Sequence, residues 1–371
     1  MQISLLDETC AAEWNALSEA EASFSMMQSW DWGEAKKQLG WDAYRVAIMD
    51  GGNIIAGAQI LVKGLPLGIG SLSYVPRGPI GHWTNPEIAR LLFDELHRVA
   101  RQKRAIFLKV EPGVVASSIN KSLFIDLGFR NSSVVNQPCT TIIMDISPAP
   151  EMILRNMRDS TRRKIQSTER KGVTSRIGTI DDLVTFYKLM QITAQRAGFA
   201  LRSFDYYKTE YLTFAQKGQA ALFLAEYQGQ ILAAHIVYAV GKHAAFFHQA
   251  SNNEASSLNP NCLLVWEEIK WAKSKGCSTY DLWGIPDEIG ELVTLEKEIP
   301  AAERTDGLWG VYRFKSGFSK NIVNYISSLD YVYSPFLYKV ISNKLINQNT
   351  YERFSVWLDK HIPRRGIRIK P

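Results

Sequence analysis

Hydrophobic and polar residues follow the same order in two parts of the chain. Two alternating stretches flank the turn Asp50-Gly-Gly-Asn53, and two more flank Gln228-Gly-Gln230, which is typical of β-hairpins. A third apolar strand, a helix that opens on Asn-Pro and a last strand follow each hairpin. The first set of expected elements is 44–49, 54–62, 72–75, 85–100 and 106–110. The second set is 222–227, 231–240, 244–248, 259–273 and 279–283.

The order repeats after about 175 residues, which indicates a duplicated domain rather than a solenoid. Each step from strand through helix to strand predicts a parallel, right-handed crossover. This succession resembles the core of the N-acetyltransferase (GNAT) fold. We therefore expect an α/β (α+β) protein with two tandem GNAT-like domains and no coiled-coil arm. The expected domains are residues 1–137 plus about 330–371, and residues 138–329.

A helix with a cation beside its aromatic residues is expected soon after the N-terminus. Ser29 is suited to cap this helix, Trp32, Lys36 and Leu39 follow at helical spacing, and Gly40 ends it. Lys36 then lies on or beside the aromatic face. A lysine in this position commonly extends its ammonium to water, so the pattern alone leaves its role open.

A second cationic segment lies near the end of the repeat. Val311, Tyr312 and Phe314 predict a short strand, because aromatic and β-branched residues favour strands. Arg313 and Lys315 lie in the same strand. An unpaired buried charge is costly, so these cations either reach water from an edge strand or face an anion.

Length and composition restrict the class of protein. A chain of 371 residues is too long for one ordinary core, and 46% hydrophobic with 22% charged residues is a globular balance. The net charge of +6 permits an anionic partner without requiring one. The 4 cysteines are far apart and form no CxxC pair, which argues against a zinc ribbon or a disulfide framework and fits a reducing cytosol. The N-terminus shows no secretory signal and no window is apolar enough to cross a membrane, so we expect a cytoplasmic protein without a metal.

The loops that follow the third strands do not suit coenzyme A. GNAT enzymes usually hold its pyrophosphate with the backbone N–H groups of a glycine-rich loop at a helix N-terminus. Here the loops are Arg77-Gly-Pro-Ile-Gly81, which contains a proline without an N–H, and Gln249-Ala-Ser-Asn-Asn253, which has no glycine. We therefore expect the acyl group to arrive on another carrier, and no cofactor.

Five segments in the same order resemble the FemABX family over nearly the whole chain. They are Met27-Gln-Ser-Trp-Asp-Trp32, Tyr74-Val-Pro-Arg-Gly-Pro79, Asn259-Pro-Asn-Cys-Leu-Leu-Val-Trp-Glu267, Tyr280-Asp-Leu-Trp-Gly-Ile285 and Tyr312-Arg-Phe-Lys-Ser-Gly-Phe318. The resemblance implies a non-ribosomal peptidyltransferase. Such an enzyme moves an amino acid from aminoacyl-tRNA to the side-chain amine of a peptidoglycan precursor's stem peptide. The first domain would then bind the precursor and the second the aminoacyl-tRNA.

The resemblance also implies roles for particular residues. An aminoacyl ester is already activated, so the reaction needs no covalent nucleophile, and the sequence shows no Ser-His-Asp or Cys-His signature. Lys315 would supply positive charge to the developing oxyanion, with Tyr312 and Phe314 positioning it. Lys36 and Arg202 would hold the precursor's diphosphate, since a guanidinium and an ammonium are both suited to phosphate oxygens.

Five further residues are assigned to the same site. The resemblance places Tyr206 and Arg77 among the substrate-binding residues. Phe246 and His248 stand where some relatives carry tyrosines. His248 is a candidate proton acceptor, although a buried histidine with satisfied hydrogen bonds explains it equally well. Glu111 stands where an aspartate also occurs, and these departures leave the proton path open.

A basic stretch from 155 to 171 is the candidate tRNA contact. It includes Arg158, Arg162 and Arg163, and binding to RNA phosphates requires such a surface. The alternative is a solvated basic face on an amphipathic helix. The basic tail 363–370 is suited to tRNA or to anionic lipid headgroups.

Three functions therefore remain after the sequence is read. The favoured one is tRNA-dependent aminoacyl transfer to a nucleotide-linked or lipid-linked precursor, with peripheral contact at the inner face of the membrane left open. The second is a CoA-dependent N-acyltransferase acting on another amine. The third is a non-catalytic tRNA-binding protein on a transferase fold.

Overall fold

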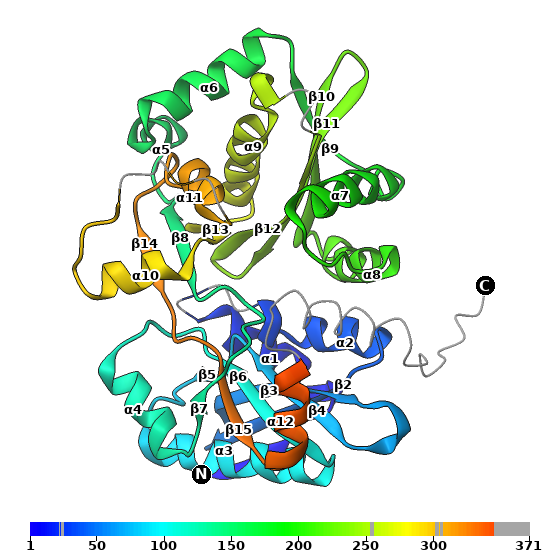
Figure 1. Ribbon diagram of the computed structural model, residues 1–371, viewed down its shortest axis with the longest axis vertical. Coiled ribbons are helices and arrows are strands. Elements are labelled where there is room, and N and C mark those ends of the chain that lie inside the picture. The colour runs from blue at the N-terminus through cyan, green and yellow to red at the C-terminus, as the bar shows by residue number, and fades with distance from the viewer. Residues whose placement is uncertain (22, 24–25, 253–255, 301–303, 305–306, 345–371) are drawn as a thin grey trace. The chain divides into compact units, whose positions relative to one another are not determined.

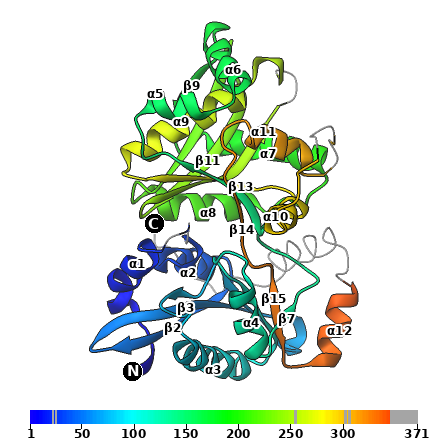
Figure 2. The same ribbon diagram turned by 90° about the vertical axis from the view of Figure 1, so that its left-hand side faces the viewer.

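The computed structural model describes residues 1–21, 23, 26–252, 256–300, 304 and 307–344 (Figures 1 and 2). The chain forms two compact units. Unit 1 contains residues 1–137 and the chain from 325 onward, and unit 2 contains residues 138–324. Each unit is built around its own sheet.

The sheet of unit 1 has the strand order β1-β2-β3-β4-β6-β15-β7, and β5 pairs with β3. These strands are β1 (Gln2–Leu5), β2 (Asp42–Asp50), β3 (Asn53–Gly64), β4 (Ser71–Pro76), β5 (Ile80–Gly81), β6 (Ala105–Glu111), β7 (Arg130–Asn131) and β15 (Leu329–Val332). The last strand, β15, lies between β6 and β7. Lys109 and Asp330 face each other across β6 and β15, and their side chains form a buried ion pair of 2.9 Å. This pair holds the late strand in the sheet.

Helices cover both faces of this sheet. They are α1 (Ala11–Glu19), α2 (Trp30–Gln38), α3 (Pro86–Gln102), α4 (Ser118–Asp126) and α12 (Pro335–Lys344). Helices α3 and α4 pack on the main core, which includes Phe93 and Phe124. Helices α1 and α2 pack on a smaller cluster that includes Trp14 and Trp30. The expected helix after Ser29 is confirmed, and the Ser29 side chain accepts from the N–H of Trp32.

The sheet of unit 2 has the strand order β14-β8-β13-β12-β11-β10-β9. Its strands are β8 (Thr140–Asp145), β9 (Thr174–Ile177), β10 (Ala220–Tyr227), β11 (Gln230–Val240), β12 (His243–Ser251), β13 (Thr279–Gly284) and β14 (Ile322–Asn324). Its helices are α5 (Pro150–Asn156), α6 (Asp159–Arg170), α7 (Leu183–Ala197), α8 (Phe204–Ala215), α9 (Pro260–Ser274), α10 (Asp287–Thr294) and α11 (Trp309–Lys315). Figure 1 shows α9 on one face of β10–β12 and α7 and α8 on the other.

The repeat predicted from the sequence is present in both units. Each has a hairpin, β2–β3 or β10–β11, followed by a third antiparallel strand, a helix and a parallel strand. The parallel pairs are β4–β6 and β12–β13. The pairs differ in length: β4 and β6 stay paired up to Pro76 and Glu111, whereas β12 and β13 pair only as far as Ala245 and Asp281.

The structure corrects the prediction for the segment that carries Lys315. It forms helix α11 rather than a strand, with the N–H of Tyr312 donating to Leu308 and that of Ser316 donating to Tyr312. Trp309 and Tyr312, one helical turn apart, pack against the core of unit 2. Tertiary packing therefore overrides the strand propensity of these aromatic and β-branched residues.

A second correction concerns the loop expected from Gln249. Strand β12 continues to Ser251, and Asn253 lies outside the described residues. The strand is prolonged because β12 keeps its pairing with β11 as far as Ser251 opposite Ala233.

Candidate active site

The candidate site of unit 2 lies where the parallel strands β12 and β13 separate. In the part of the chain that the structure describes, Ala245 and Asp281 are their last paired residues. Beyond this point β13 turns sharply, because Trp283 has a φ of 63° and its N–H donates to the Asp281 carboxylate at 2.7 Å. A positive φ is uncommon for a bulky residue and marks local strain. We call the ends of β12 and β13 from Ala245 and Asp281 onward the divergence site.

Lys315 reaches both separated strands. Its Nζ donates to the Gly284 carbonyl of β13 at 2.8 Å and lies 5.8 Å from the centroid of the Phe246 ring of β12. The residue is 5% exposed, so its amine is almost completely removed from water. It is the last residue of α11, where a cation is stabilised by the helix dipole.

The environment of Lys315 changes its proton affinity. Burial lowers the pKa of the Lys315 ammonium from its ordinary value to about 7, and the Asp281 carboxylate opposes part of that shift. Asp281 is itself buried and accepts a hydrogen bond from the Thr141 hydroxyl. Near neutral pH both the charged and the neutral form of Lys315 are therefore populated, which suits a group that donates or accepts a proton.

The end of α11 is fixed by close packing. The Gly317 carbonyl accepts from the N–H of Arg158 at 2.9 Å, at the start of α6. A Cβ added at Gly317 would overlap the Thr161 hydroxyl. Glycine at this position therefore permits a close approach of the backbone.

Tyr312 and Phe314 brace α11 and contact other aromatic rings. Tyr312 packs edge-on against Trp309 at 5.8 Å, and burial raises the pKa of its phenol. Phe314 packs against Phe318 at 5.2 Å. Both side chains are half-buried. Their contacts orient the helix that carries Lys315.

His248 lies on β12, beyond the divergence point. Its Nε2 is 2.8 Å from the Oε1 of Glu210, a carboxylate that is completely buried and also accepts from the Tyr238 hydroxyl at 3.2 Å. The ring of Tyr207 packs edge-on against His248 at 5.0 Å. The preceding residue, Phe247, is the extra residue of a bulge in the pairing with β11, and bulges redirect side chains.

A buried polar network behind Phe246 was not predicted from the sequence. His235 places Nδ1 2.6 Å from Glu268 Oε1 and Nε2 2.9 Å from Asn261 Oδ1, and Tyr280 donates to the same Glu268. The His235 ring packs edge-on against Phe246 at 4.7 Å. The network therefore supports the aromatic ring next to Lys315.

A sequence signal for this network was available. The repeat aligns Gln59 of β3 with His235 of β11, so each copy has one polar residue at the same place in an apolar strand. Gln59 is also completely buried, and its side-chain amide donates to the Met27 and Ser29 carbonyls at 3.1 Å. A buried polar side chain that recurs in both copies indicates a fixed network.

Arg202 lies just before α8 and is half-buried. Its guanidinium is 5.4 Å from the ring of Tyr206, and the Tyr187 hydroxyl donates to its carbonyl at 3.1 Å. Tyr206 packs edge-on against Tyr207 at 5.6 Å, and burial raises the pKa of Tyr207. Arg202 and Tyr206 therefore border the same aromatic group that contacts His248.

Three of the candidate residues belong to unit 1. Lys36 is buried, with its Nζ 3.9 Å from the centroid of the Trp32 ring, as expected for a lysine beside the aromatic face. Arg77 has a φ of 53° and stacks on Tyr325 at 4.9 Å. Glu111 accepts from the Tyr74 hydroxyl and, at 2.6 Å, from the N–H of residue 136. Both oxygens of the Glu111 carboxylate are therefore occupied by hydrogen bonds within unit 1.

The three candidate tRNA contacts lie at the start of α6. Arg158 and Arg163 are exposed. Arg162 donates to the Arg155 and Met157 carbonyls at 2.9 and 2.8 Å and forms an ion pair with Asp159, so it caps the end of α5.

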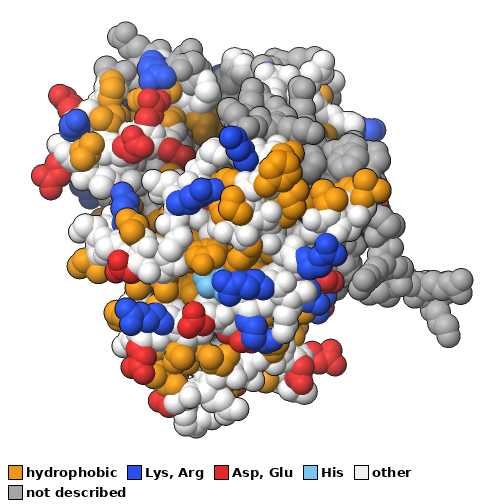
Figure 3. Space-filling model, turned by 60° about the horizontal axis from the view of Figure 1, so that its bottom comes forward, with side chains coloured by type: hydrophobic (Ala, Val, Ile, Leu, Met, Phe, Trp, Pro, Cys, Tyr) orange, Lys and Arg blue, Asp and Glu red, His pale blue; other side chains and the backbone are white. Residues whose placement is uncertain are grey.

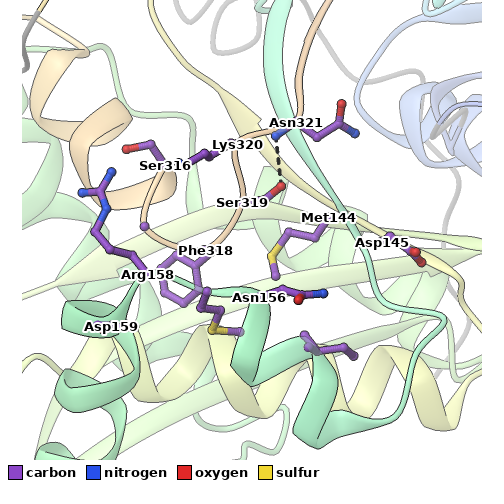
Figure 4. Close-up of a pocket in the computed structure, with 13 residues that line it drawn as sticks. Met144, Asp145, Asn156, Arg158, Asp159, Ser316, Phe318, Ser319, Lys320 and Asn321 are labelled. Carbon is purple, nitrogen blue, oxygen red and sulfur yellow. Dashed lines mark hydrogen bonds between the residues drawn. The ribbon is translucent and has the colours of Figure 1, made fainter.

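Arg158 also lines a pocket of about 740 Å³ (Figure 4). Its polar lining includes Asn156, Ser316, Ser319 and Lys320, and Figure 4 shows the Arg158 and Ser316 side chains on the same side of it. Asp145 and Asp159 also line the pocket, so the lining carries both signs of charge.

The chain is similar to proteins of known family and known structure. Residues 9–138 match the FemAB family, and residues 155–289 match an acetyltransferase (GNAT) domain. The lipid II:glycine glycyltransferase of Staphylococcus aureus strain MRSA252 is 22% identical over 89% of this chain and 93% of its own length. The same enzyme from strain USA300 matches equally well.

The resemblance to the FemAB family is thereby confirmed. The chain is accordingly an aminoacyltransferase, as the resemblance implied. Solved structures confirm the predicted fold class. The crystal structure of FemX superimposes with a TM-score of 0.79 at 21% identity over 92% of this chain and 100% of that chain. A tandem GNAT protein from the clavulanic acid biosynthesis pathway gives 0.55 at 12% identity, over 89% and 98%.

Two features are absent from the described part of the chain. No helix among the described residues has the length and apolar character needed to cross a membrane. The described residues also contain no group of 3 or more His, Cys, Asp or Glu placed to hold a metal ion.

Proposed function

We propose that this FemAB-family aminoacyltransferase moves an amino acid from aminoacyl-tRNA to the side-chain amine of a peptidoglycan precursor's stem peptide. The observation that carries the proposal is Lys315, a buried amine with a pKa of about 7 held between two separated strands. The similarity to an enzyme that acts on lipid II supports the class of acceptor.

The proposed reaction needs a cation and a proton acceptor. The acceptor amine attacks the ester carbonyl, a C–N bond forms, and the C–O bond to the tRNA ribose breaks. In its charged form, Lys315 donates to the oxyanion of the tetrahedral intermediate and stabilises it. Because the surroundings exclude water, this interaction is stronger than it would be in bulk solvent.

His248 is the proposed proton acceptor. Glu210 is bonded to its Nε2, and when Nε2 carries the proton, Nδ1 is left as the basic nitrogen. The proton released by the amine passes to that nitrogen and leaves with the ribose hydroxyl. Phe246 and its supporting His235 network hold the apolar wall that keeps Lys315 dry.

Arg202, with Tyr206 beside its guanidinium, is the proposed phosphate-binding group of unit 2. Lys36 is the proposed phosphate-binding group of unit 1. Arg202 provides a planar fork and Lys36 a point charge, and each suits phosphate oxygens of the precursor. Arg77 and Glu111 are proposed to shape the binding region in unit 1, Glu111 through the backbone that it holds.

The tRNA is assigned to the exposed start of α6. Arg158 and Arg163 are exposed there, and Arg162 supports them by capping α5. Phosphate binding by such a surface depends on salt, because bound counterions are released. We expect tRNA affinity to fall steeply as the salt concentration rises.

The deciding experiment offers the enzyme a mixed pool of charged tRNAs and purified UDP-linked and lipid-linked precursors, with product masses as the readout. We expect one precursor to gain the mass of one amino acid residue, and ribonuclease treatment of the tRNA pool to abolish the gain. No mass increase on either precursor, with charged tRNA intact at the end, would refute the proposal.

The match of residues 155–289 to a GNAT domain favours one alternative, a CoA-dependent N-acyltransferase. Saturable binding of acetyl-CoA, measured by calorimetry, would support it. We expect no such binding, because neither third strand is followed by a glycine-rich phosphate loop.

A further inference from the structure

Unit 1 exposes large apolar side chains at two places that are distant in the sequence. Leu67, in the turn between β3 and β4, is 98% exposed, and Ile69 follows it. Phe336, near the start of α12, is 77% exposed, and Val340 lies one turn further on. Single exposed apolar residues are common, but grouped ones indicate a binding surface.

One small core brings the two places together. Leu65 and Leu72, on either side of the β3–β4 turn, belong to the same cluster as Ile106, Leu337 and Ile341. The backbone agrees, because the N–H of Leu65 donates to Gly70, which closes the turn beside this cluster. The exposed residues therefore border one cluster; we call Leu67, Ile69, Phe336 and Val340 the apolar rim.

The apolar rim is on the face of the sheet opposite α3 and α4. Along β15, Tyr331 packs with the core under α3 and α4, whereas the next residue, Val332, packs with the cluster under α12. Successive side chains of a strand point to opposite faces, so the two clusters lie on opposite faces of the sheet.

Basic residues adjoin the apolar rim. Arg104 is exposed, and its carbonyl accepts from the N–H of Ser71 at 3.0 Å, next to the β3–β4 turn. Arg130 is exposed and lies 4.4 Å from the Tyr338 ring of α12, and Lys339 is exposed on the same helix. Figure 3 shows Lys and Arg side chains interspersed with hydrophobic ones on the face that it draws.

We propose that the apolar rim and these basic residues dock the enzyme onto an anionic lipid bilayer. Exposed leucine, isoleucine and phenylalanine gain by entering the boundary between headgroups and acyl chains, and lysine and arginine at the same depth gain from lipid phosphates. An RNA surface would not call for Leu67 and Phe336, because aliphatic groups and a lone ring gain little from phosphates. The proposal concerns attachment of the enzyme and stands apart from the chemistry at the divergence site.

The sequence beyond the described residues is consistent with this partner. It continues directly from α12 and carries six further basic residues, Arg353, Lys360, Arg364, Arg365, Arg368 and Lys370, against two acidic ones, Glu352 and Asp359. Additional positive charge next to a membrane-binding element strengthens attachment to anionic lipids.

The test is co-sedimentation of the full chain with vesicles, without any substrate. We expect binding to vesicles of phosphatidylcholine mixed with phosphatidylglycerol, and weak binding to pure phosphatidylcholine. The double variant Leu67→Asp/Phe336→Asp should lose about tenfold or more in partition coefficient, since it removes two apolar anchors and adds two repelled charges. High salt should weaken binding of the wild type.

The matched control is Ile119→Asp. Ile119 is 78% exposed and is the second residue of α4, as Phe336 is of α12, but α4 packs with the core on the opposite face. We expect this variant to bind vesicles like the wild type. Melting temperatures of all variants show whether they are folded.

Four results would overturn the proposal. They are no vesicle binding by the wild type, equal binding to neutral and anionic vesicles, full binding by a folded double variant, and equal loss in Ile119→Asp. Loss of tRNA affinity in the double variant would reassign the surface to RNA. Because the assay contains no substrate, its failure leaves the proposed transfer reaction untouched, and a failed transfer assay leaves vesicle binding untouched.

Discussion

Replacing Lys315 by methionine should make the protein more stable while removing most of its activity. Lys315 is the buried amine at the divergence site, and burial holds its pKa at about 7 instead of the ordinary 10.5. Methionine has a similar length and no charge. The variant therefore keeps the packing and removes the ammonium.

The size of the effect follows from the pKa. In the folded chain the pKa lies below its unfolded value, so the unfolded chain binds the proton more strongly. The resulting penalty is complete below about pH 7, where it amounts to roughly 5 kcal/mol, and it disappears as the pH rises toward 10.5. The substitution also leaves the Gly284 carbonyl without its donor, which costs about 1–3 kcal/mol. We therefore expect a net gain in the free energy of unfolding of about 3 kcal/mol at pH 6.

The assay is urea unfolding of wild type and Lys315→Met between pH 6 and pH 10, followed by circular dichroism. The advantage of the variant should shrink as the pH rises and change sign near pH 9, where the remaining penalty falls to about 2 kcal/mol. A folded variant that is less stable than the wild type at pH 6 would refute the argument that burial strains this amine. Leu282→Met, a substitution at a buried apolar residue of β13, is the control and should show no such dependence on pH.

Three further predictions concern the reaction. The single-turnover rate of the wild type should rise about tenfold per pH unit up to about pH 7 and then level off, because Lys315 loses its charge as the acceptor amine gains its free form. The rate of the slower Lys315→Met variant should keep rising with pH. A wild-type rate that also kept rising would contradict the proposed role of the Lys315 ammonium. His248→Gln should lower kcat by 10²–10⁴-fold with little change in KM, and Glu210→Gln should lower it less; an unchanged kcat in His248→Gln would remove this residue from the proton path. Arg163→Glu should weaken tRNA binding several-fold at low salt and reduce its salt dependence, whereas the same change at Lys217, outside α6, should not.

Much of the fold could be predicted because the signals were local. The turns at Asp50-Gly-Gly-Asn53 and Gln228-Gly-Gln230 fix two hairpins, and Ser29 fixes the start of α2 through a hydrogen bond within four residues. Both Asn-Pro sequences do start helices, although only Asn85 caps with its side chain, whereas Asn259 adopts a φ of 55°. The pattern therefore identified the elements without showing how each begins.

The parts that were missed depend on contacts between distant residues. Helix α11 reads as a strand by composition, and its helical form is fixed by packing of Trp309 on the core and of Gly317 against Thr161. The hydrogen bond from Lys315 to Gly284 joins residues 31 apart, and the one between His235 and Glu268 joins residues 33 apart. No local pattern encodes such pairs. Only the alignment of Gln59 with His235 in the repeat hinted at the second.

The two units differ at the ends of their parallel strand pairs, β4–β6 and β12–β13. In unit 1 the parallel strands stay paired to Pro76 and Glu111, and the Glu111 carboxylate is occupied by Tyr74 and by the N–H of residue 136. In unit 2 the corresponding strands separate, and a buried amine reaches both of them. In unit 1 the strands stay paired and the Glu111 carboxylate is already hydrogen-bonded, so this place offers no group for chemistry. In unit 2 the Lys315 amine titrates near neutral pH and offers one. The duplication thus explains why bond-making is expected in the second copy alone.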